Sequence, residues 1–260
     1  MYQTLRIETD ARGVATLWLA RSEKHNAMSA QMLEDLVAAA KALGADDAVR
    51  VVILASEGKT FCAGGDLAWM RAQFEMDSAT RRRESAKLST MLQALDTLPK
   101  PLIGRVQGNA FGGGMGLMSV CDVVVAVAGA RFGFTETRLG LIPANIGPFV
   151  LRRMGPALAR RVFMSARLFD TGEAMDLGLV ARAVAAEDLD ATVEAEVAPY
   201  LSCAPGAVAD AKALIRALGG GVSQAEMDLA IDGLAARWES AEAQDGIAAF
   251  FDKRKPGWVD

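Results

Sequence analysis

The sequence predicts an α/β fold followed by a helical C-terminal region, and three observations support this fold class. Short, largely apolar runs recur through the first half of the chain, as in VVILA, LIGRV and VVVAV. Loops and stretches of helical periodicity separate these runs, an order typical of α/β units rather than of a β-sandwich. After Gly147 the strand-like runs cease and apolar residues recur at helical spacing.

The first predicted elements are a hairpin and a helix. Alternating or apolar runs on either side of Asp10–Gly13 predict the hairpin, with strands at Leu5–Thr9 and Val14–Leu19. Ser29 can cap a helix through Leu43, because its hydroxyl can accept a hydrogen bond from the first turn and apolar residues follow at helical spacing.

Buried strands then alternate with helices. The predicted strands are Val51–Ala55, Leu102–Val106 and Val123–Val127. Asp66 can cap a helix after the first glycine-rich loop, and Asp77 or Ser78 opens a long charged helix. That helix should end before Pro99, and a further helix follows the second glycine-rich loop as far as Val120.

The rest of the chain is predicted to be helical and to divide at residue 201. We expect residues 1–201 to form a core with the ligand site, and residues 202–260 to form a helical region for contacts between subunits. The predicted helices are Pro148–Met154, Ala157–Ser165, Glu173–Leu177, Leu189–Leu201, Ala207–Leu218, Gln224–Glu239 and Glu242–Phe251.

Composition excludes several classes of protein. The formal net charge of −4 gives no electrostatic reason to expect nucleic acid or an anionic membrane as a partner. The run Arg81–Arg83 is interpreted as the solvated face of a helix. The apolar content of 52% suggests that sister subunits cover part of the surface.

Targeting and metal-binding signals are not found. The N-terminus carries charges where a signal peptide would be apolar, and no run is long enough for a spanning helix, so we expect a cytoplasmic protein. Three widely spaced cysteines form no metal-ligand pattern. His25 is the only histidine and no GxSxG accompanies it, which argues against a serine protease.

Two glycine-rich loops and a later glutamate form the candidate catalytic set. The loops are FCAGGDL at Phe61–Leu67 and GNAFGGGMGL at Gly108–Leu117, and the glutamate is Glu136. Glycine lets backbones approach closely, so two such loops can direct two amides at one oxygen. Paired amides stabilise an oxyanion, and a nearby carboxylate can carry the proton. The pattern therefore indicates an enzyme that converts a carbonyl compound into its enolate.

Five segments, in this order, resemble the crotonase, or enoyl-CoA hydratase/isomerase, superfamily. They are KHNAM, FCAGGDL, GNAFGGGMGL with the following CDVVVA, FGFTETRLGLIP and AFFDKRKPGW, and together they span nearly the whole chain. The resemblance implies a ββα spiral core, a helical C-terminal region that trimerises, and an acyl-CoA thioester substrate with no metal or other cofactor. A homotrimer, or a hexamer made of two trimers, is the implied assembly.

The resemblance also implies catalytic roles for three residues. The family's two oxyanion donors are backbone amides at the alanine of AGxD and at the middle glycine of GGG, here Ala63 and Gly113. Gly113 would begin a helix whose positive dipole end adds to the stabilisation. Glu136 occupies the position of the glutamate that transfers the proton at the α-carbon.

A second glutamate, which many members carry at the end of GGGxE, is replaced here by Gly116. A single carboxylate could deliver water to C3 and a proton to C2 from one face, or it could move a proton between C2 and C4. FCAGGDLAWM and ETRLGLIPANIGPFV look like segments of methylglutaconyl-CoA hydratases and of related hydratases for branched glutaconyl-CoA thioesters.

The favoured interpretation is therefore a hydratase of a branched, methylglutaconyl-type 2-enoyl-CoA in fatty acid, leucine or isoprenoid catabolism. One alternative is a Δ3,Δ2-enoyl-CoA isomerase that uses the single glutamate. A second alternative is a non-catalytic homologue that binds CoA esters or RNA, although retention of Glu136 and the acidic composition argue against it.

Substrate contacts follow from the same resemblance. Lys24 and Ala27 are expected to flank the nucleotide, and Phe250 and Lys253 occupy the positions of a C-terminal aromatic and lysine that contact CoA, often the CoA bound to the neighbouring subunit. The expected walls along the adenine and pantetheine are Ala63, Gly64, Gly65, Asp66 and Leu67. Trp69, Met70 and Phe134 are the expected walls of the acyl pocket, with core packing as the alternative. The second carboxylate of a glutaconyl substrate would be bound by Arg71, Arg138 or Asn145.

Overall fold

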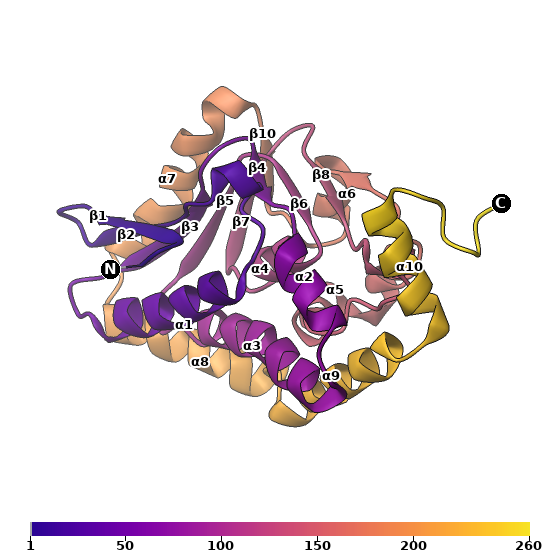
Figure 1. The fold of residues 1–260 in the computed structure, drawn as a ribbon. Helices are drawn as coiled ribbons and strands as arrows, with labels where there is room; N and C mark the ends of the chain where they lie inside the picture. Colours follow the sequence, from indigo (N-terminus) through magenta and orange to yellow (C-terminus); the bar gives the residue numbers. More distant parts are fainter. Residues whose placement is uncertain (1) are drawn as a thin grey trace.

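The computed structural model describes residues 2–260, which form two sheets with helices around them (Figure 1). The larger sheet has six strands in the order β1-β2-β3-β5-β7-β10. Only β1 and β2 pair antiparallel, and each later neighbour is parallel. The strands are β1 (Leu5–Thr9), β2 (Val14–Leu19), β3 (Val51–Ser56), β5 (Leu102–Val106), β7 (Val123–Val127) and β10 (Arg182–Val184). The predicted hairpin and the three predicted buried strands are confirmed.

A second sheet of four very short strands was not predicted. Its order is β4-β6-β8-β9, with β4, β6 and β8 parallel and β9 antiparallel to β8. The strands are β4 (Thr60–Cys62), β6 (Asn109–Phe111), β8 (Arg131–Gly133) and β9 (Phe169–Asp170). Runs of two or three residues are too short to show the alternation that identifies a strand from sequence.

The chain repeats one path through both sheets. It enters the large sheet at β3, β5 or β7, passes directly into β4, β6 or β8 of the small sheet, and then forms a helical segment. This repetition is the predicted ββα spiral, and it places the three small-sheet strands next to one another.

The helices begin largely where capping residues predict. Ser29, Asp66 and Asp77 accept hydrogen bonds from the first-turn amides of α1, α2 and α3. The helical segments of the first part are η1 (Ser22–Lys24), α1 (Ala30–Ala45), α2 (Leu67–Phe74), α3 (Ser78–Asp96), α4 (Gly113–Ser119), η2 (Glu136–Leu139) and α5 (Gly147–Ala159). Those that follow are α6 (Thr171–Asp176), η3 (Ala186–Asp188), α7 (Leu189–Leu201), α8 (Pro205–Gly219), α9 (Gln224–Trp238) and α10 (Ala241–Asp252).

The predicted helix at Ala157–Ser165 is wrong. Helix α5 is interrupted at Gly155, where φ is 73°, and it ends at Ala159. Beyond it the amides of residues 161–163 turn back onto Leu158 and Ala159 and form turns instead of a helix. The kink at Gly155 falls between the two predicted helices, and residues 157–159 are helical, so the prediction fails only beyond Ala159.

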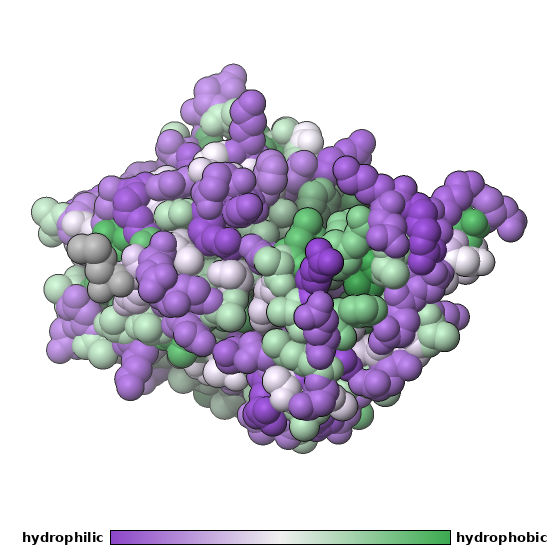
Figure 2. Space-filling model, in the orientation of Figure 1, coloured by the Kyte–Doolittle hydropathy of each residue, from purple (hydrophilic) through white to green (hydrophobic). Residues whose placement is uncertain are grey.

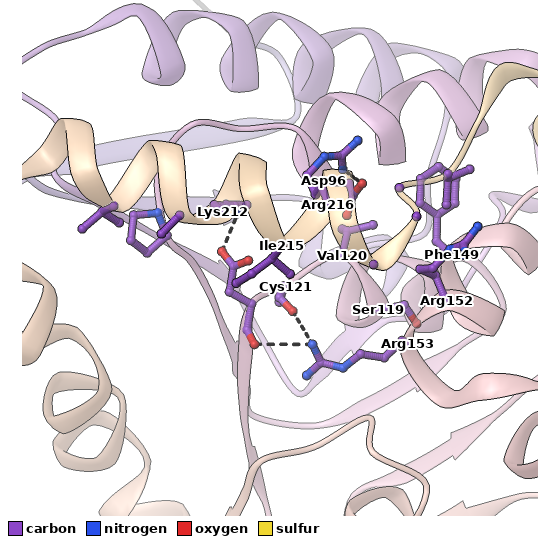
Figure 3. A pocket seen from close by; sticks show the side chains of 18 of the residues that line it. Asp96, Ser119, Val120, Cys121, Phe149, Arg152, Arg153, Lys212, Ile215 and Arg216 are labelled. Atoms are coloured by element: carbon purple, nitrogen blue, oxygen red, sulfur yellow. Dashed lines mark hydrogen bonds and ion pairs between the residues drawn. The ribbon is translucent and has the colours of Figure 1, made fainter.

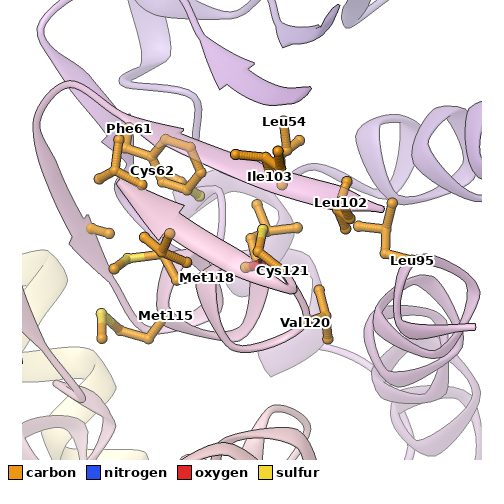
Figure 4. Packing of buried hydrophobic residues seen from close by; sticks show 14 of the residues in the cluster. Leu54, Phe61, Cys62, Leu95, Leu102, Ile103, Met115, Met118, Val120 and Cys121 are labelled. Carbon is orange, nitrogen blue, oxygen red and sulfur yellow. Dashed lines mark hydrogen bonds between the residues drawn. The ribbon is translucent and has the colours of Figure 1, made fainter. Parts of the chain in front are cut away.

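Helix α4 lies at the centre of the core (Figure 4). Its side chains Met115 and Met118 are fully buried, close to Phe61 and Cys62 of β4. Gly114 lets α4 approach β4 closely, because a methyl group on it would lie 2.6 Å from the Cys62 carbonyl oxygen. The core therefore fixes this short helix against the strand that carries the first glycine-rich loop.

The Arg81–Arg83 run joins the C-terminal helices to the core, and the predicted solvated face is wrong at Arg81. That residue is buried, its Nε donates to the Gln73 carbonyl at 2.9 Å, and it pairs with Glu239. Arg82 pairs with Asp232 of α9.

Within residues 2–260 no helix is long and apolar enough to cross a bilayer.

Candidate active site

The three segments of the candidate catalytic set meet at one edge of the small sheet. They follow β4, β6 and β8, which are parallel neighbours, so their carboxyl ends lie side by side. A methyl group placed on Gly112 would lie 3.1 Å from Glu136 Oε1 and 3.9 Å from the Gly64 Cα. One placed on Gly64 would lie 3.8 Å from the Gly113 nitrogen. The glycine-rich loops and the glutamate are thus in direct proximity.

The Gly113 amide is free to bind an anion. Gly113 is the first residue of α4, where backbone amides lack a partner within the helix, and its amide makes no hydrogen bond within residues 2–260. A side chain here would displace the end of Met28, since a methyl group would lie 1.8 Å from Met28 Cε. The buried Met28 therefore supports this backbone turn from behind.

The Ala63 amide is not free, which contradicts the prediction that it is the first oxyanion donor. It donates to the His25 carbonyl at 3.0 Å. The chain around Met28 runs parallel to this loop, with Met28 donating to the Gly64 carbonyl and the Asp66 amide donating to Met28. Because backbone groups alternate along an extended segment, the Gly65 amide points away from this pairing. It makes no hydrogen bond in the described part of the chain, so it is the available donor of this loop.

Asp66 has a structural role that the sequence interpretation missed in part. The capping function is confirmed, since Oδ1 accepts from the Ala68 and Trp69 amides at 2.8 and 3.3 Å. Its Oδ2 accepts from Arg21 at 3.0 Å. Both carboxylate oxygens are therefore engaged within the protein, where they hold the start of α2 and the Arg21 guanidinium.

Arg21 is a residue that the sequence analysis did not single out. Besides Asp66, it donates to the Ala27 carbonyl at 2.7 Å, so one guanidinium connects the two segments expected at the nucleotide. Burial by itself would raise the pKa of Asp66, but Arg21 and the backbone amides outweigh it and lower that pKa. An ion pair between two loops at this spacing gives no pattern in a single sequence.

Glu136 has the properties of a proton carrier. Its Oε2 is buried without a hydrogen-bond partner in the described residues, and it forms no ion pair with the neighbouring Arg138. Burial raises the pKa of Glu136 from 4.5 to about 7, with its own backbone amide opposing part of that rise. A carboxyl group with a pKa near neutrality can both accept and donate a proton under physiological conditions.

The space next to Gly116 explains why a second glutamate has no place here. A methyl group on Gly116 would lie 2.7 Å from Ile146 Cγ2 and 3.0 Å from Leu92 Cδ1. Gly116 lies in the first turn of α4, and Ile146 and Leu92 form an apolar wall against it. The wall occupies the volume that a side chain from position 116 would need.

The acyl-pocket candidates separate into two groups. A methyl group on Gly65 would lie 3.5 Å from Met70 Cγ and 3.9 Å from Trp69 Cε3, so these side chains flank the free amide. Phe134 is instead a core residue: it is fully buried, with its ring centroid 5.2 Å from that of Phe163. The assignment of Phe134 to the acyl pocket is replaced by the core-packing alternative.

The distal polar candidates also differ in environment. Arg138 is exposed and makes no ion pair within residues 2–260, whereas the Arg71 guanidinium lies 5.8 Å from the centre of the Phe251 ring. Asn145 is partly buried, its Oδ1 has no hydrogen-bond partner in the described chain, and its carbonyl accepts from Ser89.

The C-terminal helix α10 folds over the site of its own chain. It packs on η2, and a second apolar cluster joins it to α2, α9 and the loop after η2. The cluster contains Leu141, Ala144, Leu234, Trp238, Ala243 and Ile247, with Phe74, Leu139, Ile142, Ala230 and Phe251 against it. In Figure 2 apolar residues gather in a hollow between α2 and α10.

Several of the expected CoA-binding side chains lie at the surface. Phe250, at the end of α10, is 47% exposed and stands edge-on to Phe251. Lys24 and Lys253 are exposed, and Leu67 at the start of α2 is 52% exposed. These exposed groups are available to a ligand.

A cavity of about 620 Å³ lies at the opposite end of α4 and is a different region (Figure 3). Its cations are already paired: Lys212 with Asp122 at 2.7 Å, and Arg216 with Asp96. Arg153 donates to the Cys121 carbonyl. The carboxylates of this cavity, Asp96 and Asp122, are both in ion pairs, so it holds no unpaired carboxyl group like that of Glu136 among the described residues.

Comparison with known proteins agrees with the fold. The sequence model of the enoyl-CoA hydratase/isomerase family matches residues 9–260. A protein of Thermus thermophilus assigned to the enoyl-CoA hydratases is 35% identical over 256 residues, covering 96% of this chain and 99% of the relative.

Solved structures agree over the whole length. An enoyl-CoA hydratase from Shewanella pealeana has 36% identity and a TM-score of 0.81, covering 99% of this chain and 97% of that one. Pseudomonas aeruginosa AtuE has 38% identity and a TM-score of 0.81, covering 99% and 100%. This chain therefore belongs to the enoyl-CoA hydratase/isomerase family and is an enoyl-CoA hydratase-like lyase.

Proposed function

We propose that this enzyme adds water across the 2,3 double bond of a branched, methylglutaconyl-type 2-enoyl-CoA. The observation that carries the proposal is the buried Glu136 carboxylate beside two unpaired backbone amides, those of Gly65 and Gly113. The thioester oxygen would accept hydrogen bonds from both amides. Charge that develops on that oxygen during the reaction is then stabilised by preorganised donors, each worth about 3 kcal/mol.

Glu136 would carry out both proton transfers. Its carboxylate takes a proton from water as the water oxygen bonds to C3, and the π electrons of the double bond move toward the thioester oxygen to form the enolate. The enolate then re-forms the carbonyl and takes the same proton at C2 from the Glu136 carboxyl. One group suffices because its pKa of about 7 suits both directions, and Ile146 and Leu92 fill the space of a second acid.

Binding of CoA is assigned to exposed groups around the hollow between α2 and α10. Lys24 and Lys253 would contact the phosphates, and Phe250 and the backbone of Ala27 and Gly64–Leu67 would flank the adenine and pantetheine. The exposure of Lys24, Leu67, Phe250 and Lys253 supports the assignment. No metal or redox cofactor is needed for these steps, and we expect full activity in the presence of a chelator.

Arg138 is the favoured partner for the second carboxylate of a glutaconyl substrate. It is two residues from Glu136, it is exposed, and it has no anionic partner in the described residues. Trp69 and Met70 would form the apolar wall that adjoins the Gly65 amide. A guanidinium recognises a carboxylate through two parallel hydrogen bonds, which a monocarboxylic enoyl thioester cannot use.

The substrate test compares 3-methylglutaconyl-CoA with crotonyl-CoA. Loss of the enoyl absorbance should be faster with the branched dicarboxylic thioester, and Arg138→Met should remove that preference while leaving crotonyl-CoA turnover near its original rate. A coupled assay for the Δ3→Δ2 shift runs in parallel. Isomerisation without hydration would contradict the proposal, and equal rates with both enoyl thioesters would contradict the substrate assignment.

We also propose that the chain assembles as a homotrimer, or as a hexamer of two trimers. Large apolar side chains are exposed on α8 and α9, namely Leu214, Ile215, Leu218 and Leu229. Exposed apolar residues concentrated in this way are typical of subunit contacts. Sedimentation equilibrium should give three or six times the chain mass, and a monomer at micromolar concentration would contradict the assignment.

A further inference from the structure

The turn that carries Glu136 is held from outside by the C-terminal helices of the same chain. Arg237 of α9 donates from Nε and Nη2 to the Gly140 carbonyl oxygen, at 2.9 and 2.7 Å. The same guanidinium pairs with Glu242 of α10 at 2.7 Å. One side chain thus connects the end of η2 to both helices.

Helix α10 contacts this turn through backbone as well. A methyl group on Gly140, where φ is 71°, would lie 2.7 Å from the backbone of Glu242. One on Gly246 would lie 2.7 Å from the carbonyl of Leu139. Only glycines at these two positions permit such an approach. The backbones of α10 and η2 are therefore in direct contact.

The held segment and the catalytic residue are parts of one short turn. The Leu141 amide donates to the Glu136 carbonyl at 3.2 Å, and the Gly140 amide donates to the Thr137 carbonyl. A shift of Gly140 therefore changes the backbone position of Glu136. The Oε2 atom of its carboxylate is buried and has no hydrogen-bond partner among the described residues, so the position of the turn bears directly on this group.

We propose that Arg237 is a positioning residue that holds the Glu136 turn, and that α9 and α10 form part of the active site of their own chain. This inference rests on the proposed role of Glu136 as proton carrier. Beside the expected subunit contacts and the expected CoA contacts of Phe250 and Lys253, it gives residues 202–260 a role in holding the catalytic turn. The charged groups around the turn are Arg138 on η2 itself, Arg237 on α9 and Glu242 on α10.

The geometry requires arginine at this position. The planar guanidinium places two N–H groups on one carbonyl oxygen while a third can reach Glu242. Lysine has a single nitrogen on a flexible chain and cannot reproduce that arrangement. Misplacement of a catalytic group by about 1 Å can lower the rate on the order of 100-fold.

The test compares Arg237→Met and Arg237→Lys with a matched control, Arg82→Met. Arg82 lies on α3 and pairs with Asp232 of α9, the helix that also carries Arg237. The control therefore removes an ion pair of α9 that does not involve η2. For each variant we measure steady-state kinetics with a 2-enoyl-CoA that the original enzyme hydrates. We also measure binding of the CoA ester, thermal unfolding and the pH profile of kcat. We expect kcat to fall about 10- to 100-fold in Arg237→Met, with a smaller change in KM, because the ligand contacts remain.

The pH profile separates positioning from general stability. If the turn opens to water in Arg237→Met, the kcat profile should shift toward lower pH, whereas Arg82→Met should keep the original profile even if it unfolds at a lower temperature. Should Arg237→Met fail to fold, Arg237→Lys provides the same readout. An unchanged kcat and profile in both Arg237 variants would overturn the inference, as would an identical loss in Arg82→Met.

The proposed function is checked separately with Glu136→Gln. If Glu136→Gln is inactive and the Arg237 variants behave like the original enzyme, only the positioning inference fails. If Glu136→Gln retains turnover, the assignment of the proton carrier fails first.

Discussion

Replacing Glu136 with glutamine should abolish turnover and, above neutral pH, increase the stability of the folded protein. Burial raises the pKa of this carboxyl group from 4.5 to about 7. That rise corresponds to roughly 3 kcal/mol of free energy by which folding disfavours the ionised form. Glutamine keeps nearly the same shape but never ionises, so it removes this cost together with the proton carrier.

The sign of the pH dependence follows from proton binding in the two states. Below pH 4.5 the carboxyl is protonated in both the folded and the unfolded chain, so its burial costs no ionisation energy. Between pH 4.5 and about 7 the unfolded chain loses the proton first, and the free energy of unfolding falls as pH rises. Above pH 7 the whole cost is present.

The assay is urea unfolding at pH 5 and pH 8 together with thermal unfolding. We expect Glu136→Gln to gain roughly 3 kcal/mol over the original protein at pH 8 and roughly 0.8 kcal/mol at pH 5. The gain at pH 8 should raise Tm by roughly 5–10 °C for a chain of this size. Glu187→Gln, at an exposed position, serves as the control. A gain of equal size at both pH values, or retained turnover, would refute the reasoning.

The remaining predictions concern the amides, the wall and the core. Gly65→Pro removes the free amide and should lower kcat about 100- to 1,000-fold, whereas Gly65→Ala keeps it and should stay active; equal kinetics in both variants would exclude this donor. Gly116→Glu should lower the free energy of unfolding by several kcal/mol and gain no activity, because Ile146 occupies its space; urea unfolding checks this, and a faster enzyme would contradict it. Phe134→Leu should cost about 1–3 kcal/mol of stability with KM unchanged, and a KM effect without destabilisation would return Phe134 to the pocket.

Local patterns in the sequence were sufficient for most of the large sheet and its helices. Val51–Ser56 and Val123–Val127 are continuous apolar strands because helices cover both faces of the sheet. Ser29, Asp66 and Asp77 cap helices through contacts with residues two or three positions away. Such short-range chemistry is readable without knowledge of the fold.

The small sheet and the available oxyanion donor could not be predicted in the same way. Strands of two or three residues have too little length for a period, yet β4, β6 and β8 decide which loops meet. The alanine of AGxD suggested Ala63 as the donor. Its amide is instead consumed by His25, a residue 38 positions earlier in the chain.

The sequence by itself determined the family, the two glycine-rich loops and the single candidate acid, because these depend on residue types in a fixed order. Only the tertiary structure decided which amide is free, why position 116 has no room for a second acid, and that Arg237 reaches the turn of Glu136. These last properties depend on contacts between segments distant in the chain. The direction of one backbone amide or the position of one guanidinium leaves no periodic trace in a single sequence.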